Sequence, residues 1–241
     1  MTTIVTPPTI TPQSINYPSG DGTPVAETFD HLYVILITIE VLRQYFEDIQ
    51  ACVLGNQFLY YSQGLPRLKC APDVMVIFGV EPGSRDSYKI WEEGEIPKVV
   101  FEMTSPGTRD KDEGFKKDLY AQIGIEEYWQ FDPKGQWIEE KLRGYRLVDE
   151  TYVPIATSES QALGLRLEVS GALISFYRLD NGEKLLIPLE LRNKAQHLQD
   201  ELTLEQARLL LEQTRSQELE NQLNQAQAEI DRYRKQFGDL P

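Results

Sequence analysis

Apolar residues recur every three to five positions between Val25 and about Asp48, at Phe29, Val34, Ile37, Val41 and Tyr45. This spacing predicts an amphipathic helix packed on a sheet. Before it, residues 1–24 hold five of the fourteen prolines together with several serines and threonines. That composition favours an extended, poorly ordered arm, which we expect to be the first of three parts of the chain.

Strand patterns follow the predicted helix. Residues 52–61 are rich in β-branched and aromatic residues, and 72–80 and 98–104 are nearly continuous apolar runs. Such runs are typical of strands that are covered on both faces. The intervening 81–97 is polar and turn-rich, so we expect a surface loop there.

A second helix is predicted over 110–124, with Gly124 at its C-terminal end. It is followed by an apolar strand pattern over 127–132 and by four short strand patterns, which we expect to add antiparallel strands, at 143–148, 151–156, 165–169 and 173–177. The strand–strand–helix–strand order in the middle predicts an α/β or α+β domain over 25–190, with a mixed sheet flanked by helices.

The third part, 191–241, is dominated by Gln, Glu, Leu and Arg and lacks proline and glycine until Gly238. A heptad register that starts with Ala195 at position a puts thirteen residues at a and d, ten of them apolar: Ala195, Leu198, Leu202, Glu205, Leu209, Glu212, Ser216, Leu219, Leu223, Ala226, Ile230, Tyr233 and Phe237. This pattern favours a long helix that forms a coiled coil. Polar residues interrupt the middle, and Leu204, Leu210 and Leu211 offer competing faces, so a charged helix lying along the domain is the alternative.

Charge and composition narrow the class of protein. With 24 basic and 38 acidic residues, the formal charge is 24 − 38 = −14, which does not favour nonspecific coating of nucleic acid. Two cysteines without metal-ligand spacing fit a reducing compartment. The N-terminus does not resemble a signal peptide, and the most hydrophobic stretch, 32–42, is too short to span a bilayer. We therefore expect a cytoplasmic protein without a membrane partner.

Two carboxylates stand in the apolar runs. Asp73 opens the first run and Glu102 lies inside the second. A carboxylate in a buried strand is costly unless its charge is compensated, and a divalent cation is one means of compensation. Magnesium prefers oxygen ligands, which these two side chains and the Met103 carbonyl offer if the strands are neighbours, and Lys116 would stabilise negative charge nearby.

Each of these features also has a purely structural explanation. Pro72-Asp73 is a common turn element before a strand, and Glu102 could form an ion pair with Arg109 or Lys116. Asp112 and Lys116, four residues apart, could form a surface pair. Other enzyme signatures are missing, since the sequence has no Walker A loop, dinucleotide-binding glycine fingerprint or Gly-x-Ser-x-Gly elbow.

Several short motifs in order resemble the PD-(D/E)XK nuclease superfamily, and most closely its Uma-type family of restriction-endonuclease-like proteins. The motifs are Ala71–Val74, Phe101–Pro106 with Thr108-Arg109, Asp112–Tyr120, Gly124–Trp129 and Asp132-Pro133. The resemblance covers about residues 25–180. It implies a restriction-endonuclease-like fold with Asp73 and Glu102 as metal ligands.

One position departs from the superfamily pattern. The lysine expected two residues after Glu102 is replaced by Thr104, and the resemblance assigns its role to Lys116 on the following helix. Asp112, Lys116 and Tyr120 share a helix face at four-residue spacing, and Phe115, Leu119 and Ile123 form the adjacent apolar stripe that we expect to dock on the sheet. The resemblance adds two accessory residues on the first helix, Glu27 and His31.

Together these features predict a magnesium-dependent endonuclease, with manganese as a possible substitute, that hydrolyses phosphodiester bonds of DNA. Lys116 would assist the water or the phosphate, and Asp112 and Tyr120 would support that lysine. Homodimerisation would suit the cutting of two strands, and 191–241 would bind a coiled-coil partner. The alternatives are a nuclease-like scaffold without catalysis and an oligomeric coiled-coil interaction protein.

Overall fold

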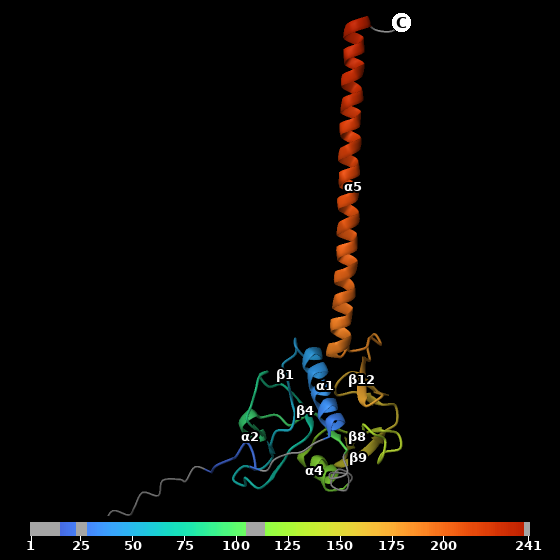
Figure 1. Ribbon diagram of the computed structural model, residues 1–241. Helices are drawn as coiled ribbons and strands as arrows, with labels where there is room; N and C mark the ends of the chain where they lie inside the picture. Colours follow the sequence, from blue (N-terminus) through green and yellow to red (C-terminus); the bar gives the residue numbers. More distant parts are fainter. Residues whose placement is uncertain (1–14, 23–27, 105–113, 239–241) are drawn as a thin grey trace, which may run out of the picture. The chain divides into compact units, whose positions relative to one another are not determined.

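The computed structural model describes residues 15–22, 28–104 and 114–238. The chain forms two compact units, Met1–Pro188 and Leu189–Pro241. The first unit contains, in chain order, the helices and strands α1 (Phe29–Tyr45), β1 (Ala51–Leu54), β2 (Leu59–Tyr60), β3 (Lys69–Cys70), β4 (Val74–Phe78), β5 (Tyr88–Lys89), α2 (Ile90–Glu93), β6 (Val99–Met103), α4 (Phe115–Ile123), β7 (Glu127–Phe131), β8 (Leu142–Val148), β9 (Thr151–Ile155), β10 (Glu159–Ser160), β11 (Leu165–Ser170) and β12 (Leu173–Arg178). The long helix α5 (Pro188–Phe237) forms the second unit (Figure 1).

A six-stranded mixed sheet with the order β1-β4-β6-β7-β8-β9 is the centre of the first unit. β6 and β7 are parallel, and the other neighbouring pairs in this sheet are antiparallel. Parallel neighbours need a crossover connection, and α4 lies in the segment that connects these two strands. The expected mixed sheet flanked by helices is confirmed.

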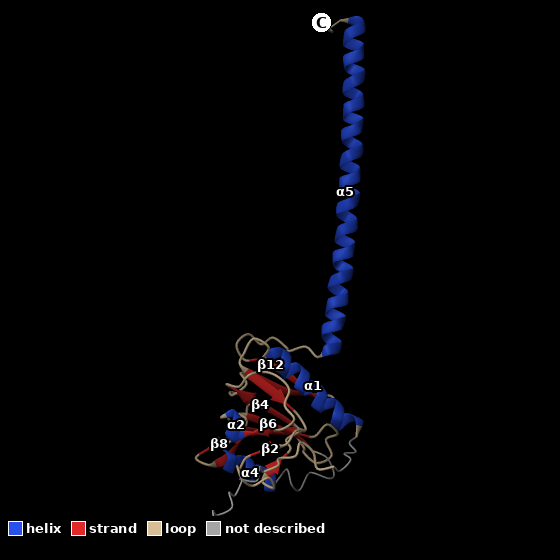
Figure 2. Ribbon diagram, turned by 90° about the vertical axis from the view of Figure 1, so that its left-hand side faces the viewer, coloured by secondary structure: helices blue, strands red, loops and turns tan. Residues whose placement is uncertain are grey.

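Two apolar clusters cover the two faces of this sheet. On one face, α1 and the small sheet β10-β11-β12 pack over Val76, Phe101 and Trp129. On the other face, Tyr120 of α4 packs with Met75, Val100 and Tyr128. In Figure 2, α1 lies on one side of the strands and α2 and α4 lie on the other. The central strands are therefore buried on both faces, as their apolar runs predicted.

Some details differ from the sequence-based expectation. Residues 52–61 do not form one strand, because a turn with Asn56 at φ 51° separates β1 from β2. The expected loop 81–97 contains β5 and α2. Phe115, predicted to dock α4 on the sheet, is 67% exposed, whereas Leu119 and Tyr120 are buried. The docking face of α4 is thus turned away from Phe115 and towards Tyr120.

The ends of the helices that carry site residues follow ordinary capping rules. Thr28 caps α1, its hydroxyl accepting a hydrogen bond from the His31 backbone N–H at 3.4 Å. α4 ends at Gly124, whose φ of 92° suits a residue without a side chain, as the sequence predicted. These caps set where His31 lies at the start of α1 and how long α4 is.

The described part of the N-terminal arm, residues 15–22, contacts the domain through the Tyr17 side chain and the Pro18 carbonyl. The Tyr17 ring lies 5.1 Å from the rings of Tyr60 and Trp91, and its hydroxyl accepts a hydrogen bond from the Gly64 N–H at 2.6 Å. Tyr60 also donates its hydroxyl proton to the Pro18 carbonyl. These contacts anchor this part of the arm.

The second unit is one helix of 50 residues. Ten of its leucines are exposed, as are Ile230 and Tyr233. Among the described residues, no helix combines the length and apolar character needed to cross a membrane.

Candidate functional site

The two predicted metal-binding carboxylates lie on neighbouring strands. β4 pairs with β6 so that Val74 faces Phe101, which puts Asp73 and Glu102 at the next opposed positions. Side chains alternate between the two faces of a strand. Met75 and Val100, each two residues away, belong to the cluster beneath α4. The Glu102 carboxyl group therefore belongs to the face of the sheet that α4 covers, whereas Asp73 precedes β4 and its carboxylate bonds to the Met103 backbone.

The Glu102 carboxylate is buried and accepts two hydrogen bonds from α4. Its Oε2 lies 2.7 Å from the Lys116 ammonium, and its Oε1 accepts from the Tyr120 hydroxyl. The side chain of Glu102 is 1% exposed, so the ion pair with Lys116 compensates a charge that water does not reach. Lys116 and Tyr120 are one helical turn apart, which explains how one helix face supplies both donors.

Tyr120 acts as a neutral donor. Burial, and then the negative charge of Glu102, raise the pKa of its hydroxyl well above the ordinary value. The group therefore remains protonated and donates to the carboxylate over the whole physiological range. Its ring packs edge-on against Tyr128, with centroids 5.3 Å apart, which fixes the direction of the hydroxyl.

Asp73 and His31 meet at the backbone of Met103. The Oδ2 atom of Asp73 accepts a hydrogen bond from the Met103 N–H at 2.6 Å. The His31 ring donates from Nε2 to the Met103 carbonyl at 2.7 Å and lies 3.6 Å from the same carboxylate oxygen. The end of β6 is thus tied to β4 and to the first turn of α1.

The structure brings together five of the seven residues that the sequence suggested: Asp73, Glu102, Lys116, Tyr120 and His31. The other two, Glu27 and Asp112, lie outside the described residues, as do motif positions 105–109. At the position where the superfamily has its lysine, the Thr104 hydroxyl is buried and finds no hydrogen-bond partner among the described residues. Lys116 reaches the carboxylate from α4 instead.

The donor atoms of this region are oxygens, the ligand type that hard divalent cations prefer. Asp73 and Glu102 stand at opposed positions of neighbouring chain segments, and the Met103 carbonyl is a further oxygen donor. Magnesium commonly takes one or two carboxylates together with waters and phosphate. Each carboxylate oxygen can accept two hydrogen bonds, so Lys116 and Tyr120 leave acceptor capacity on Glu102. Within the described ranges, no cluster of three or more His, Cys, Asp or Glu side chains is arranged to hold a metal. A site here would therefore rely on two acidic side chains.

Two residues of this region were not expected from the sequence. Burial, with a smaller contribution from the charge of Glu102, raises the pKa of the Cys70 thiol to about 12, which places Cys70 beside the site. Gln130, on β7 directly opposite Glu102, is also buried. Like Glu102, Gln130 is a polar residue inside an apolar run, so the sequence pattern could have indicated it. Nothing in the local sequence indicates Cys70.

A second buried carboxylate, Glu127, has a different environment. Its side chain is 0% exposed, and Oε1 lies 3.0 Å from the Arg146 guanidinium and 3.0 Å from the Gln161 N–H. The Trp129 indole donates to the other oxygen at 3.2 Å. These donors join β7 to the segment before β11, so Glu127 stabilises the fold.

Asp132, from the last motif of the resemblance, organises a turn next to the site. Its carboxylate accepts hydrogen bonds from the backbone N–H groups of Lys134, Gly135, Trp137 and Ile138 at 2.5–3.1 Å. The turn borders a hollow of about 50 Å³ that His31 and Thr104 also line. This volume accommodates one or two water molecules, which is too little for a nucleobase.

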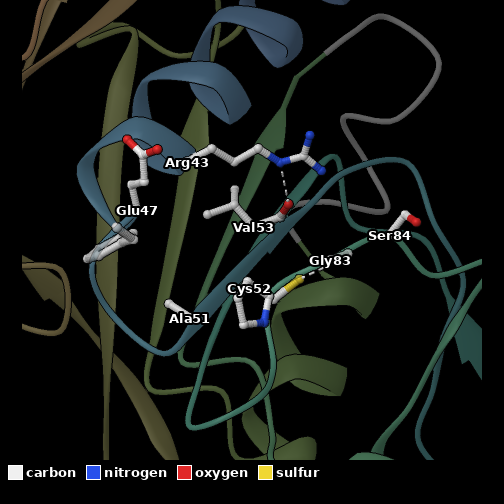
Figure 3. A pocket seen from close by; sticks show the side chains of 9 residues that line it. Arg43, Glu47, Ala51, Cys52, Val53, Gly83 and Ser84 are labelled. Carbon is white, nitrogen blue, oxygen red and sulfur yellow. Dashed lines mark hydrogen bonds between the residues drawn. The ribbon is translucent and has the colours of Figure 1, made fainter.

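A larger hollow of about 350 Å³ lies at the edge strand β1 (Figure 3). There Arg43 donates to the Val53 carbonyl at 3.1 Å, and the Cys52 thiol donates to the Gly83 carbonyl at 3.4 Å. Its described lining includes one carboxylate, that of Glu47, so it lacks the pair of acids found between β4 and β6.

The family model Uma2, described as "Putative restriction endonuclease", matches residues 11–175, which supports a nuclease-like function. A search of the curated proteins finds no match. The chain is similar to the crystal structure of a "putative nuclease belonging to DUF820" from Anabaena variabilis ATCC 29413, with 14% identity and a TM-score of 0.43 over 58% of this chain and 76% of that chain.

The raised pKa of Cys70 predicts that its thiol reacts slowly with alkylating reagents. In a Cys52→Ser variant, Cys70 is the remaining cysteine. Because its pKa is raised to about 12, the fraction of Cys70 present as thiolate near neutral pH is roughly a thousandth of that of a free cysteine. We expect the rate of iodoacetamide alkylation to keep rising between about pH 8 and pH 10 in the folded protein, and to level off in that range after unfolding in urea. A plateau near pH 9 in the folded protein would contradict the assignment.

Proposed function

Since this chain belongs to the Uma2 restriction endonuclease family, we propose that it is a metal-dependent endonuclease that hydrolyses phosphodiester bonds of DNA. Asp73 and Glu102 would hold magnesium or manganese, with the Met103 carbonyl as a further oxygen donor. Lys116 would act beside them on the phosphate or the attacking water. The observation that carries the proposal is that the register of β4 and β6 puts the two acids at opposed positions, with the Lys116 ammonium 2.7 Å from the Glu102 carboxylate.

Each residue has a defined part in the proposed reaction. A divalent cation bound by the two carboxylates would neutralise charge on the phosphate and lower the pKa of a bound water. The Lys116 ammonium, held 2.7 Å from Glu102, adds a fixed positive charge where the phosphorane develops negative charge. Tyr120 holds Glu102 in place, and His31 holds the Met103 carbonyl, so neither donor group has to reorganise when substrate binds.

A nuclease-like scaffold without catalysis is the competing proposal. Both oxygens of Glu102 already accept hydrogen bonds, from Lys116 and Tyr120, and this arrangement also suits a purely structural ion pair. Metal binding separates the two proposals, because a structural pair has no need of a cation.

The nuclease proposal predicts that DNA cleavage depends on Asp73. With magnesium or manganese present, the wild-type protein should cut plasmid or oligonucleotide DNA, and Asp73→Ala should lower the rate by about 100-fold or more through loss of a metal ligand. Glu139→Ala, at an exposed acid, is the matched control and should cut normally. Undiminished cleavage by Asp73→Ala, measured on gels over time, would rule out this site.

Metal affinity can be measured independently of cleavage. Isothermal titration with manganese should show binding to the wild-type protein, and Glu102→Gln should weaken it by at least about 10-fold because one anionic ligand becomes neutral. Glu139→Gln should bind as the wild type does. The absence of a heat of binding in the wild-type protein would favour the scaffold instead.

We further propose that α5 pairs with α5 of a second copy in a parallel coiled coil. An isolated helix of this length with a row of exposed leucines gains stability from burying them against a partner. In the parallel alignment, Arg215 at a g position faces Glu220 of the second copy, and Glu229 faces Arg234. Glu205 and Glu212 would oppose their own copies at d positions, which makes the middle of the coil its weakest part. The dimer would supply two nuclease sites for two strands.

The heptad register makes this proposal testable with matched leucines. Leu219 and Leu223 lie at d and a, whereas Leu210 and Leu211 lie at b and c. Exposure does not distinguish them, since Leu223 is 68% and Leu211 is 72% exposed. Replacing the first pair by Asp should yield a monomer in analytical ultracentrifugation, and replacing the second pair should leave the dimer intact. Equal effects of the two double variants, or a monomeric wild-type protein, would refute the coiled coil.

A further inference from the structure

A row of polar side chains continues from Glu102 across the neighbouring strands. In the register of the sheet, Glu102 of β6 faces Gln130 of β7, and Gln130 faces Arg143 of β8. Side chains at opposed positions of adjacent strands lie on the same face. The row therefore leads along the face covered by α4, from the buried carboxylate to a half-buried guanidinium.

Gln130 orients this guanidinium. Its Oε1 accepts a hydrogen bond from the Nε atom of Arg143 at 2.7 Å, and its Nε2 donates to the Tyr128 hydroxyl at 2.9 Å. Gln130 itself is 1% exposed, so its amide cannot turn freely to another partner. The hydrogen bond from Nε fixes the direction of the guanidinium.

A second cation lies close to Arg143. The Lys117 ammonium lies 3.7 Å from the centroid of the Tyr145 ring, and Tyr145 is two residues after Arg143 on the same strand. Partial burial, and then the positive charge of Arg143, lower the pKa of Lys117, and the negative charge of Asp118 partly offsets this. A phosphate bound beside both cations would relieve the repulsion between them. Lys117 is adjacent to Lys116 in sequence, but it serves a different part of the surface.

We propose that Lys117 and Arg143 bind a backbone phosphate of the nucleic-acid strand, next to the phosphodiester held at Asp73 and Glu102; this inference rests on the proposed nuclease function. Arg143 is two strands away from Glu102, on the order of 10 Å, so the pair contacts a neighbouring phosphate and not the scissile one. The guanidinium fork and the ammonium are the groups that proteins use for phosphate oxygens. In a chain with a net charge of −14, such local cations are needed to hold DNA.

The test measures binding without cleavage. Fluorescence anisotropy of a labelled DNA oligonucleotide, with calcium in place of magnesium, gives the affinity at several salt concentrations. Lys117→Gln and Arg143→Gln should each weaken binding roughly 5- to 10-fold and lower the slope of log affinity against log salt by about 1. Lys98→Gln is the control, since Lys98 precedes β6 at the end remote from Glu102 and pairs with Glu126 at 3.5 Å. It should bind as the wild type does.

A conservative variant separates phosphate binding from a structural role. Arg143→Lys keeps the positive charge and should keep the salt slope, even if affinity falls because the hydrogen bond to Gln130 is lost. If Arg143 only supports Gln130, Arg143→Lys should behave like Arg143→Gln, and the inference is overturned. Complete displacement of the oligonucleotide by inorganic phosphate at matched ionic strength would also overturn it, because the pair would then serve a free anion.

The outcomes also distinguish this inference from the nuclease proposal. Cleavage by the wild-type protein together with unchanged binding by both Gln variants overturns the phosphate site and leaves the nuclease intact. Oligonucleotide binding that depends on Lys117 and Arg143, without cleavage in magnesium or manganese, supports the phosphate site and removes the catalytic claim. A wild-type protein that does not bind the oligonucleotide overturns the phosphate site.

Discussion

The carboxylate of Glu102 lies in the middle of a sheet that is covered on both faces, and its charge has to be compensated inside the protein. Lys116 and Tyr120 provide this compensation from the helix that connects β6 with β7. The parallel pairing of these two strands needs a crossover connection, and the helix within it turns Lys116 and Tyr120 towards Glu102. In this orientation Tyr120 is buried and the apolar Phe115 is exposed.

Two buried acids show how the same sequence signal leads to different roles. Glu102 and Glu127 both stand in apolar strands, and both are almost completely buried. Glu127 accepts hydrogen bonds from a guanidinium, an indole and two backbone amides, and it joins β7 to the segment before β11. Glu102 instead lies next to a second carboxylate at a strand end. Burial of an acid thus identifies a candidate, and the neighbouring groups decide between structure and chemistry.

The strong negative charge of the chain and its nuclease-like site are compatible because the positive groups are placed locally. Lys116 lies at the carboxylate, and Lys117 and Arg143 lie further along the same face of the sheet. If the proposed function holds, fixed cations at these points would attract a phosphate backbone to one path, and the acidic remainder of the chain would discourage binding elsewhere.

The sequence by itself determined the elements that depend on local patterns. The apolar runs predicted β4, β6 and β7, Gly124 marked the end of α4, and four-residue spacing placed Lys116 and Tyr120 on one face. Only the tertiary structure decided which distant residues become neighbours. The division of 52–61 into two strands, the packing of the partly buried Cys70 against the cluster that contains Tyr120 and the row from Glu102 to Arg143 all depend on strand pairing between segments far apart in the chain. Strand register is set by the packing of the whole sheet, so no short stretch of sequence contains it.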